Sequence, residues 1–172
     1  MIAITLLEIL LVITCIKDSW ACNGYTMKVN SIKNCGTNNV IQIDNFDIQL
    51  DNDCNIIPKG CVTITKPFKT ANVHYTLTKP PMPALTGNTD VCSLVEGNKS
   101  ATDILSSFAL PTKCPVNAQK ICGNGDKKIN IGRFKSQLGY FAGNIKLRAE
   151  AKHDSGNTCL DVDIVLARNR NG

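Results

Sequence analysis

The sequence has 172 residues, a formal net charge of +5 and nine cysteines. It has only nine aromatic residues, and its basic residues are scattered along the chain, so it lacks the basic stripe with interleaved aromatics that is typical of nucleic-acid-binding proteins. A chain of this size is expected to form one domain with a hydrophobic core.

The chain opens with a mostly apolar segment, residues 2–13. This segment is too short to span a bilayer, which takes about 20 apolar residues. Ser19 and Ala21 place small residues before a cleavage point, as in secretory signals. We therefore expect 1–21 to be a signal peptide and 22–172 to be a single mature domain. The expected location is secreted or extracellular, with the lysosomal lumen as an alternative.

The cysteines of the mature chain form an even set, because Cys15 lies within the signal. Eight thiols in an exported chain indicate four disulfides. A zinc site needs closely spaced pairs such as C-x-x-C, and the shortest gaps here are seven and eight residues, so no metal is expected. Spacing alone leaves about 105 pairings open. The eight are Cys22, Cys35, Cys54, Cys61, Cys92, Cys114, Cys122 and Cys159.

Short segments with alternating apolar and polar residues dominate the mature chain. Asn, Gly, Asp and Pro bound them, which is typical of an all-β sandwich or barrel. The clearest alternation is in 71–78 and 160–166. The predicted strands are 26–29, 40–43, 46–50, 62–64, 71–78, 129–131, 145–151 and 160–166.

One segment, 100–110, has apolar residues at helical spacing. Ser100 is a residue type that caps helices, and Pro111 cannot continue one. The sequence therefore predicts one short helix that ends before Pro111.

Three further segments are expected at the surface. Three prolines keep 80–85 out of a central strand, so this apolar segment should lie at an edge or rim. The polar run 154–158 suits a hairpin turn between the last two strands. Asn98 begins an Asn-Lys-Ser sequon, which predicts a glycosylation site on a surface loop.

No catalytic constellation is found in the sequence. The sequence has two histidines, His74 and His153. It has no nucleophile elbow of the type G-x-S-x-G whose serine either histidine could activate. Asp161 and Asp163 alternate along one strand and so face away from the core, whereas glycoside hydrolysis needs carboxylates that converge across a cleft. A phosphate-binding glycine loop is also missing. We therefore expect no enzyme activity and no cofactor.

Large apolar residues form the remaining constellation. They either fill a dry core between two sheets or line a cavity, and periodicity does not distinguish these alternatives. The predicted ligand-binding residues are Phe46, Ile48, Val73, Tyr75, Leu77, Ile104, Leu105, Phe108, Phe134, Tyr140, Phe141 and Ile145.

The chain resembles the ML lipid-recognition superfamily, nearest its ganglioside-activator branch. The residues that carry the resemblance are Cys22 at the start of the mature chain, the segment 108–115 with its Cys-Pro, and the glycine-aromatic segment 139–147 that runs into a strand. Cys159 then precedes the last strand. The chain departs from that branch in having no further cysteines just before its Cys-Pro and in placing Cys122 after it.

This resemblance implies an immunoglobulin-like β-sandwich whose sheets splay apart to hold acyl chains. It also implies that the first and last cysteines are joined. Carried over to this sequence, the implied pairs are Cys22–Cys159, Cys92–Cys114, Cys54–Cys61 and Cys35–Cys122.

The expected function is a secreted carrier of lipid or another hydrophobic ligand, with transient contact to a membrane surface. The loop 80–85 and Tyr140-Phe141 are expected to form the mouth of the cavity. Scattered lysines are expected either to meet anionic headgroups or simply to be solvated; these are Lys66, Lys69, Lys127 and Lys128. The alternative is a secreted interaction module with a filled core, acting as an adhesion protein, an inhibitor or a toxin.

Overall fold

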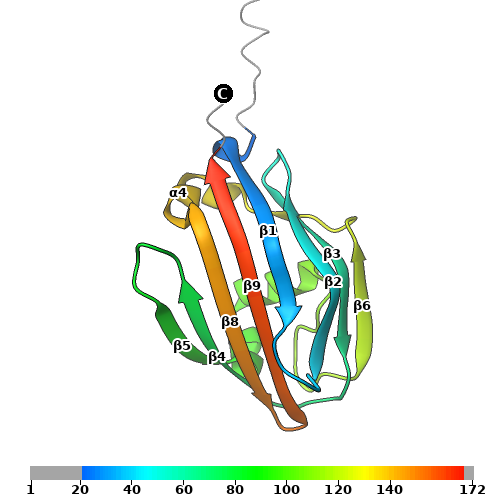
Figure 1. Cartoon of the computed structure of the whole chain (residues 1–172). Coiled ribbons are helices and arrows are strands. Elements are labelled where there is room, and N and C mark those ends of the chain that lie inside the picture. Colours follow the sequence, from blue (N-terminus) through cyan, green and yellow to red (C-terminus); the bar gives the residue numbers. More distant parts are fainter. Residues whose placement is uncertain (1–20, 169–172) are drawn as a thin grey trace, which may run out of the picture.

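The computed structural model describes residues 21–168, so the predicted signal peptide lies outside the described residues except for Ala21. Two antiparallel sheets dominate the structure, which confirms the all-β, disulfide-stabilised sandwich (Figure 1). The first sheet has the order β1-β9-β8-β4-β5 and the second the order β2-β3-β6, with β7 paired to β3. The strands are β1 (Tyr25–Asn34), β2 (Ile41–Leu50), β3 (Asn55–Ile64), β4 (Ala71–Thr78), β5 (Leu85–Asp90), β6 (Gln119–Asn124), β7 (Ile129–Asn130), β8 (Gly143–His153) and β9 (Gly156–Arg168).

The helical segments are short, and there are more of them than the sequence predicted. They are η1 (Ala21–Gly24), α2 (Val91–Gly97), α3 (Lys99–Ser107), η2 (Gly132–Gln137) and α4 (Leu138–Phe141). The predicted helix corresponds to α3. Its N-cap is Asn98 rather than Ser100, because the Asn98 Oδ1 accepts a hydrogen bond from the Ala101 N–H at 3.1 Å. It ends before the predicted limit because Ala109 adopts a left-handed φ of 58°.

The two sheets are joined at one edge and separated at the other. The Asn34 side chain at the end of β1 donates to the Ile43 carbonyl and accepts from the Ile43 N–H, both at 3.1 Å, which links β1 to β2. At the far edges, β5 and β6 belong to different sheets, and the chain between them forms α2 and α3. These helices lie behind the five-stranded sheet in the view of Figure 1.

The long hairpin of β8 and β9 shows why the alternating pattern works as a strand signal. Along β8 the residues alternate between half-buried and exposed, as expected for a strand with one face toward the interior. The turn joins His153 to Gly156, which confirms a hairpin turn between the last two strands but shortens it, because residues 156–158 belong to β9. The apolar segment 80–85, which ends at the first residue of β5, is exposed as expected, with Met82 54% and Leu85 57% accessible.

Four disulfides are present, and three of them differ from the pairs that the resemblance implied. Cys92–Cys114 is confirmed and joins α2 to the segment before β6. The others are Cys22–Cys54, Cys35–Cys159 and Cys61–Cys122.

Strand geometry explains why the implied pairs Cys22–Cys159 and Cys54–Cys61 are wrong. Cys22 lies beside the end of β9, whereas Cys159 is near its beginning, roughly 30 Å away at about 3.3 Å per residue. Cys54 immediately precedes β3, and Cys61 lies seven residues further along this strand, roughly 23 Å away. The Cα atoms of a disulfide usually lie about 4.4–6.8 Å apart, far closer than the residues of either implied pair. The implied Cys35–Cys122 pair does not form, because Cys35 is bonded to Cys159. These two cysteines meet because their neighbours Asn34 and Leu160 are paired between β1 and β9.

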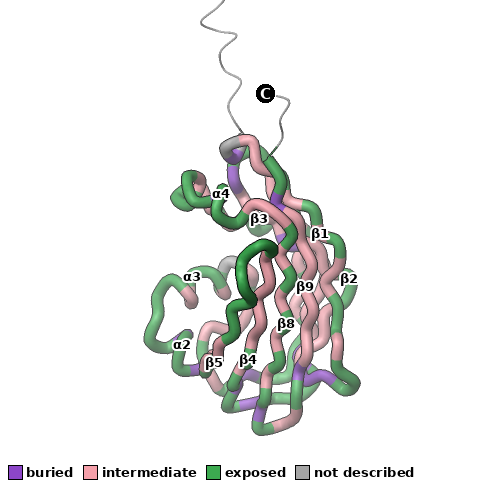
Figure 2. Tube along the Cα trace, turned by 60° about the vertical axis from the view of Figure 1, so that its left-hand side comes forward, coloured by how far each residue is buried: buried purple, intermediate pink, exposed green. Residues whose placement is uncertain are grey.

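The most buried residues gather at the two ends of the sandwich. One cluster comprises Val40, Ile64, Phe68, Ala71, Cys92 and Val116. The other, near η1 and α4, comprises Cys22, Cys54, Leu138 and Leu166. Figure 2 shows buried segments at both ends and half-buried strands between them. The middle of the sandwich is therefore less tightly filled than its ends.

Candidate functional site

A cavity of about 370 Å³ lies between the inner faces of the two sheets and the helices α2 and α3. Its lining is apolar except for Lys113 and His153. The lining residues are Ile32, Ile41, Ile43, Phe46, Ile48, Val62, Ile64, Phe68, Ala71, Val73, Val91, Cys92, Val95, Leu105, Leu110, Pro111, Lys113, Cys114, Val116, Ala151, His153, Leu160 and Val162. A volume of this size falls within the roughly 300–1,000 Å³ of small-molecule sites.

A bulge in β2 directs four large side chains into the cavity. Ile41 and Ile43 alternate inward, and the register with β3 then shifts between Asp44 and Asp47, so that Phe46 and Ile48 face the same side. The bulge requires a glycine opposite, because a Cβ on Gly60 would collide with the Asn45 carbonyl. This register shift explains why the inward residues have odd numbers before the bulge, at Ile41 and Ile43, and even numbers after it, at Phe46 and Ile48.

Small residues on the facing sheet leave the space open. Ala71 on β4 and Ala151 on β8 line the cavity directly and present only methyl groups. The disulfide between Cys92 and Cys114 also contributes to the wall and holds α2 against the segment that precedes β6. Ala71 and Ala151 therefore leave room among the larger residues that both sheets contribute to the lining.

His153 is a buried residue of the cavity lining. It is 6% exposed, and its ring centroid is 4.4 Å from that of Phe68. Its Nε2 shares a 3.1 Å hydrogen bond with the Thr158 hydroxyl, whereas Nδ1 makes none within the described chain. Burial lowers the pKa of His153 below its ordinary value of 6.5, and the nearby Thr70 backbone and Asp154 carboxylate oppose this shift to a lesser extent. His153 is therefore neutral at pH 7.

The stability of the fold is expected to fall as the pH drops below about 6.5. In the unfolded chain His153 binds a proton near pH 6.5, whereas the folded protein binds it only at a lower pH, because burial lowers the pKa. The stabilisation is complete above 6.5 and is lost as the pH falls through the lowered pKa. Urea unfolding at pH 7.5 and 5.5 measures this loss. His153→Leu should reduce the difference and His74→Gln should leave it intact; an undiminished difference in His153→Leu would contradict this explanation.

Four of the twelve predicted ligand-binding residues line the cavity: Phe46, Ile48, Val73 and Leu105. Phe108 lines an adjoining hollow of about 20 Å³. Tyr75, Leu77 and Ile145 are half-buried on strands outside the lining.

The other four predicted residues are exposed and lie outside the lining. They are Ile104 (45%), Phe134 (40%), Tyr140 (79%) and Phe141 (51%). Tyr140 and Phe141 belong to α4, near the ends of the described chain (Figure 1). The lysines considered for headgroups, Lys66, Lys69, Lys127 and Lys128, do not line the cavity either.

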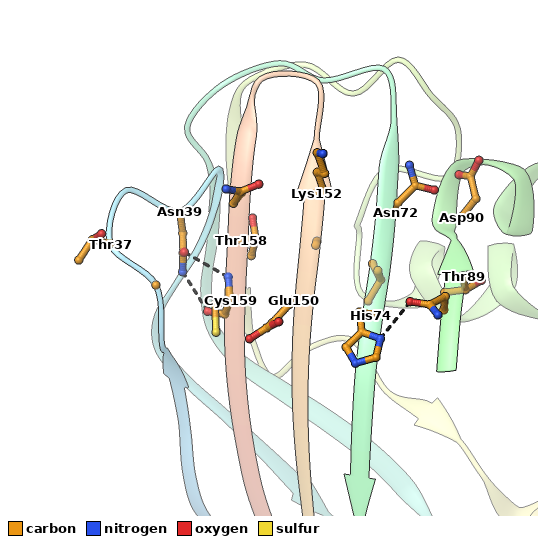
Figure 3. A pocket seen from close by; sticks show the side chains of 15 residues that line it. Thr37, Asn39, Asn72, His74, Thr89, Asp90, Glu150, Lys152, Thr158 and Cys159 are labelled. Atoms are coloured by element: carbon orange, nitrogen blue, oxygen red, sulfur yellow. Dashed lines mark hydrogen bonds between the residues drawn. The ribbon is translucent and has the colours of Figure 1, made fainter. Parts of the chain in front are cut away.

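A second hollow, of about 690 Å³, lies on the outer face of the five-stranded sheet, and its lining mixes amides with side chains of both charges (Figure 3). Its floor includes His74, Glu150 and Lys152. His74 Nδ1 is 2.9 Å from the Asn88 Oδ1, so it is paired with an amide rather than with a nucleophile or a carboxylate. Asn39 at the rim is structural, because its side chain exchanges hydrogen bonds with the Cys159 backbone. This face shows no arrangement for nucleophilic catalysis.

Residues 21–168 contain no group of three or more His, Cys, Asp or Glu side chains placed to hold a metal ion. No helix within the same range is long and apolar enough to cross a membrane. Asn98, the predicted glycosylation site, is exposed at the junction of α2 and α3.

Comparison with known proteins identifies a relative in Anopheles gambiae. No family model matches the chain. The chain is 35% identical over 150 residues to the sporozoite-associated mosquito saliva protein 1 of Anopheles gambiae, and the match covers 84% of this chain and 82% of that protein. The chain therefore belongs to the family of sporozoite-associated mosquito saliva protein 1.

Proposed function

We propose that this protein is a secreted, non-enzymatic carrier or presenter of a lipid or another hydrophobic ligand, held between its two sheets. The observation that carries this proposal is the apolar cavity of about 370 Å³. Apolar surface removed from water contributes about 0.8 kcal/mol per CH₂ group. A short stretch of acyl chain in this cavity would therefore bind with useful affinity and little polar recognition.

Secretion is supported by two independent features. Four disulfides are typical of proteins from oxidising compartments. The relative is named as a saliva protein. We also propose membership of the ML superfamily, which is supported by the two-sheet sandwich and by an apolar space between the sheets.

Transient contact with a membrane surface forms part of the proposal. Large apolar side chains are exposed on two neighbouring parts of the molecule: Met82 and Leu85 around the β4–β5 loop, and Tyr140 and Phe141 on α4. Exposed apolar groups of this kind favour interfaces. The alternative function, an interaction module with a filled core, is less favoured because the core contains the cavity.

Titration with N-phenyl-1-naphthylamine, a neutral probe that fluoresces in apolar surroundings, tests the proposal. The expected result is saturable binding of one probe per protein, lost when the disulfides are reduced. An unchanged probe spectrum over the whole titration of the folded protein would contradict the carrier function and favour the interaction module.

A further inference from the structure

The cavity has a single charged residue in its lining, Lys113. It is also the only lining residue that is exposed; the other twenty-two are buried or half-buried. Lys113 therefore marks the place where the cavity meets solvent. Within residues 21–168 its ammonium group forms neither an ion pair nor a hydrogen bond, so it is free to bind an anion from outside the chain.

The rest of the lining offers no comparable charge. Part of it is the buried cluster that includes Phe68, Ala71 and Val116, each 7% exposed or less. His153, the other polar residue of the lining, packs against Phe68 there. The cavity is thus apolar along its length and cationic only at its opening, so an amphiphile would enter with its tail first.

The volume limits how much apolar material can enter. An apolar protein cavity of roughly 150 Å³ holds a benzene molecule. By this comparison, 370 Å³ holds a chain on the order of a dozen carbons, and so one acyl chain rather than two.

We infer that the ligand is a single-chain amphiphile with an anionic head group, whose tail fills the cavity and whose head pairs with Lys113. This inference rests on the proposed carrier function and narrows it to one class of lipid. An ammonium group binds a carboxylate or a phosphate through charge-assisted hydrogen bonds and acts as a point charge toward either. A free fatty acid and a single-chain lipid phosphate therefore share the required chemistry.

The test displaces N-phenyl-1-naphthylamine with ligands that share one twelve-carbon chain and differ in the head group: dodecanoate, dodecyl phosphate, 1-dodecanol and dodecylammonium, each below its micelle concentration. We expect the anions to bind most tightly, the alcohol less tightly and the ammonium most weakly. Successive affinities should differ by roughly three- to tenfold, and these differences should shrink as salt is added. Both anions must bind more tightly than dodecanol for the inference to hold. The tighter of the two identifies the head group.

Charge reversal at Lys113 gives the decisive comparison. Lys113→Glu should invert the order so that dodecylammonium binds most tightly, while the affinity for dodecanol stays within about twofold. Lys152→Glu, an exposed residue on the outer face of the sheet, is the matched control and should keep the wild-type order. Equal binding of all four ligands, or an unchanged order in Lys113→Glu, would overturn the inference and leave the carrier function standing. Failure of the neutral probe and of every ligand to bind would overturn both.

Discussion

Replacing Cys35 and Cys159 together with alanine is expected to lower the free energy of unfolding by about 5 kcal/mol. This disulfide spans 124 residues, the longest separation of the four. In the chain-entropy model, a longer closed loop restricts the unfolded chain more and so contributes more stability. A loss of this size is comparable to the whole stability of many domains, which is about 5–15 kcal/mol. Equilibrium unfolding in urea, monitored by circular dichroism, measures it.

The Cys92–Cys114 disulfide provides the matched comparison, because it spans only 22 residues. Its double alanine variant should lose about 3 kcal/mol. If this variant were destabilised as much as the one lacking Cys35 and Cys159, the loop-length explanation would be wrong. If the longer-loop variant does not fold at all, the shorter-loop variant should still show a cooperative transition.

Filling the cavity with a larger side chain is expected to weaken ligand binding by at least tenfold. Ala151 lines the cavity from β8, so the phenyl ring of Ala151→Phe would occupy space that the ligand needs. Excluding two methylene groups costs about 1.6 kcal/mol, which is more than tenfold in affinity. Titration with N-phenyl-1-naphthylamine measures the change.

Ala149→Phe is the control for this prediction. Ala149 lies two residues away on the same face of β8, and it does not line the cavity. Added bulk in a packed region costs about 1–3 kcal/mol of stability, so both variants are expected to be destabilised to a similar extent. Only Ala151→Phe should lose binding. Equal binding by the two variants would place the ligand somewhere other than this cavity.

The fold could be predicted from the sequence where strands have one apolar and one polar face. This is why β4 was predicted at its observed bounds, and why β8 and β9 were predicted as shorter segments within theirs. The strands β5 and β6 were missed because Leu85–Asp90 and Gln119–Asn124 are edge strands with few large apolar residues. The disulfide pairs could not be predicted either, because they depend on which strand ends meet in space. Cys61 and Cys122, for example, face each other only because β3 pairs with β6.

The site was predicted less well than the fold, for a physical reason. Alternation identifies the inward face of a strand but not which part of that face borders a hollow. The prediction selected large side chains, whereas the cavity exists partly because Ala71 and Ala151 are small. Lys113, beside a cysteine in a loop, has no pattern that distinguishes it from other solvated lysines. Its importance comes from the position of the Cys92–Cys114 disulfide in the cavity wall.

In the proposed function, the space between the sheets holds the apolar part of a ligand. The most direct measurement is native mass spectrometry of the protein secreted from eukaryotic cells and purified without detergent. We predict a species heavier than the chain by one lipid molecule, which organic solvent removes and which Ala151→Phe lacks. The bare mass alone, unchanged after incubation with excess N-phenyl-1-naphthylamine, would contradict the claim.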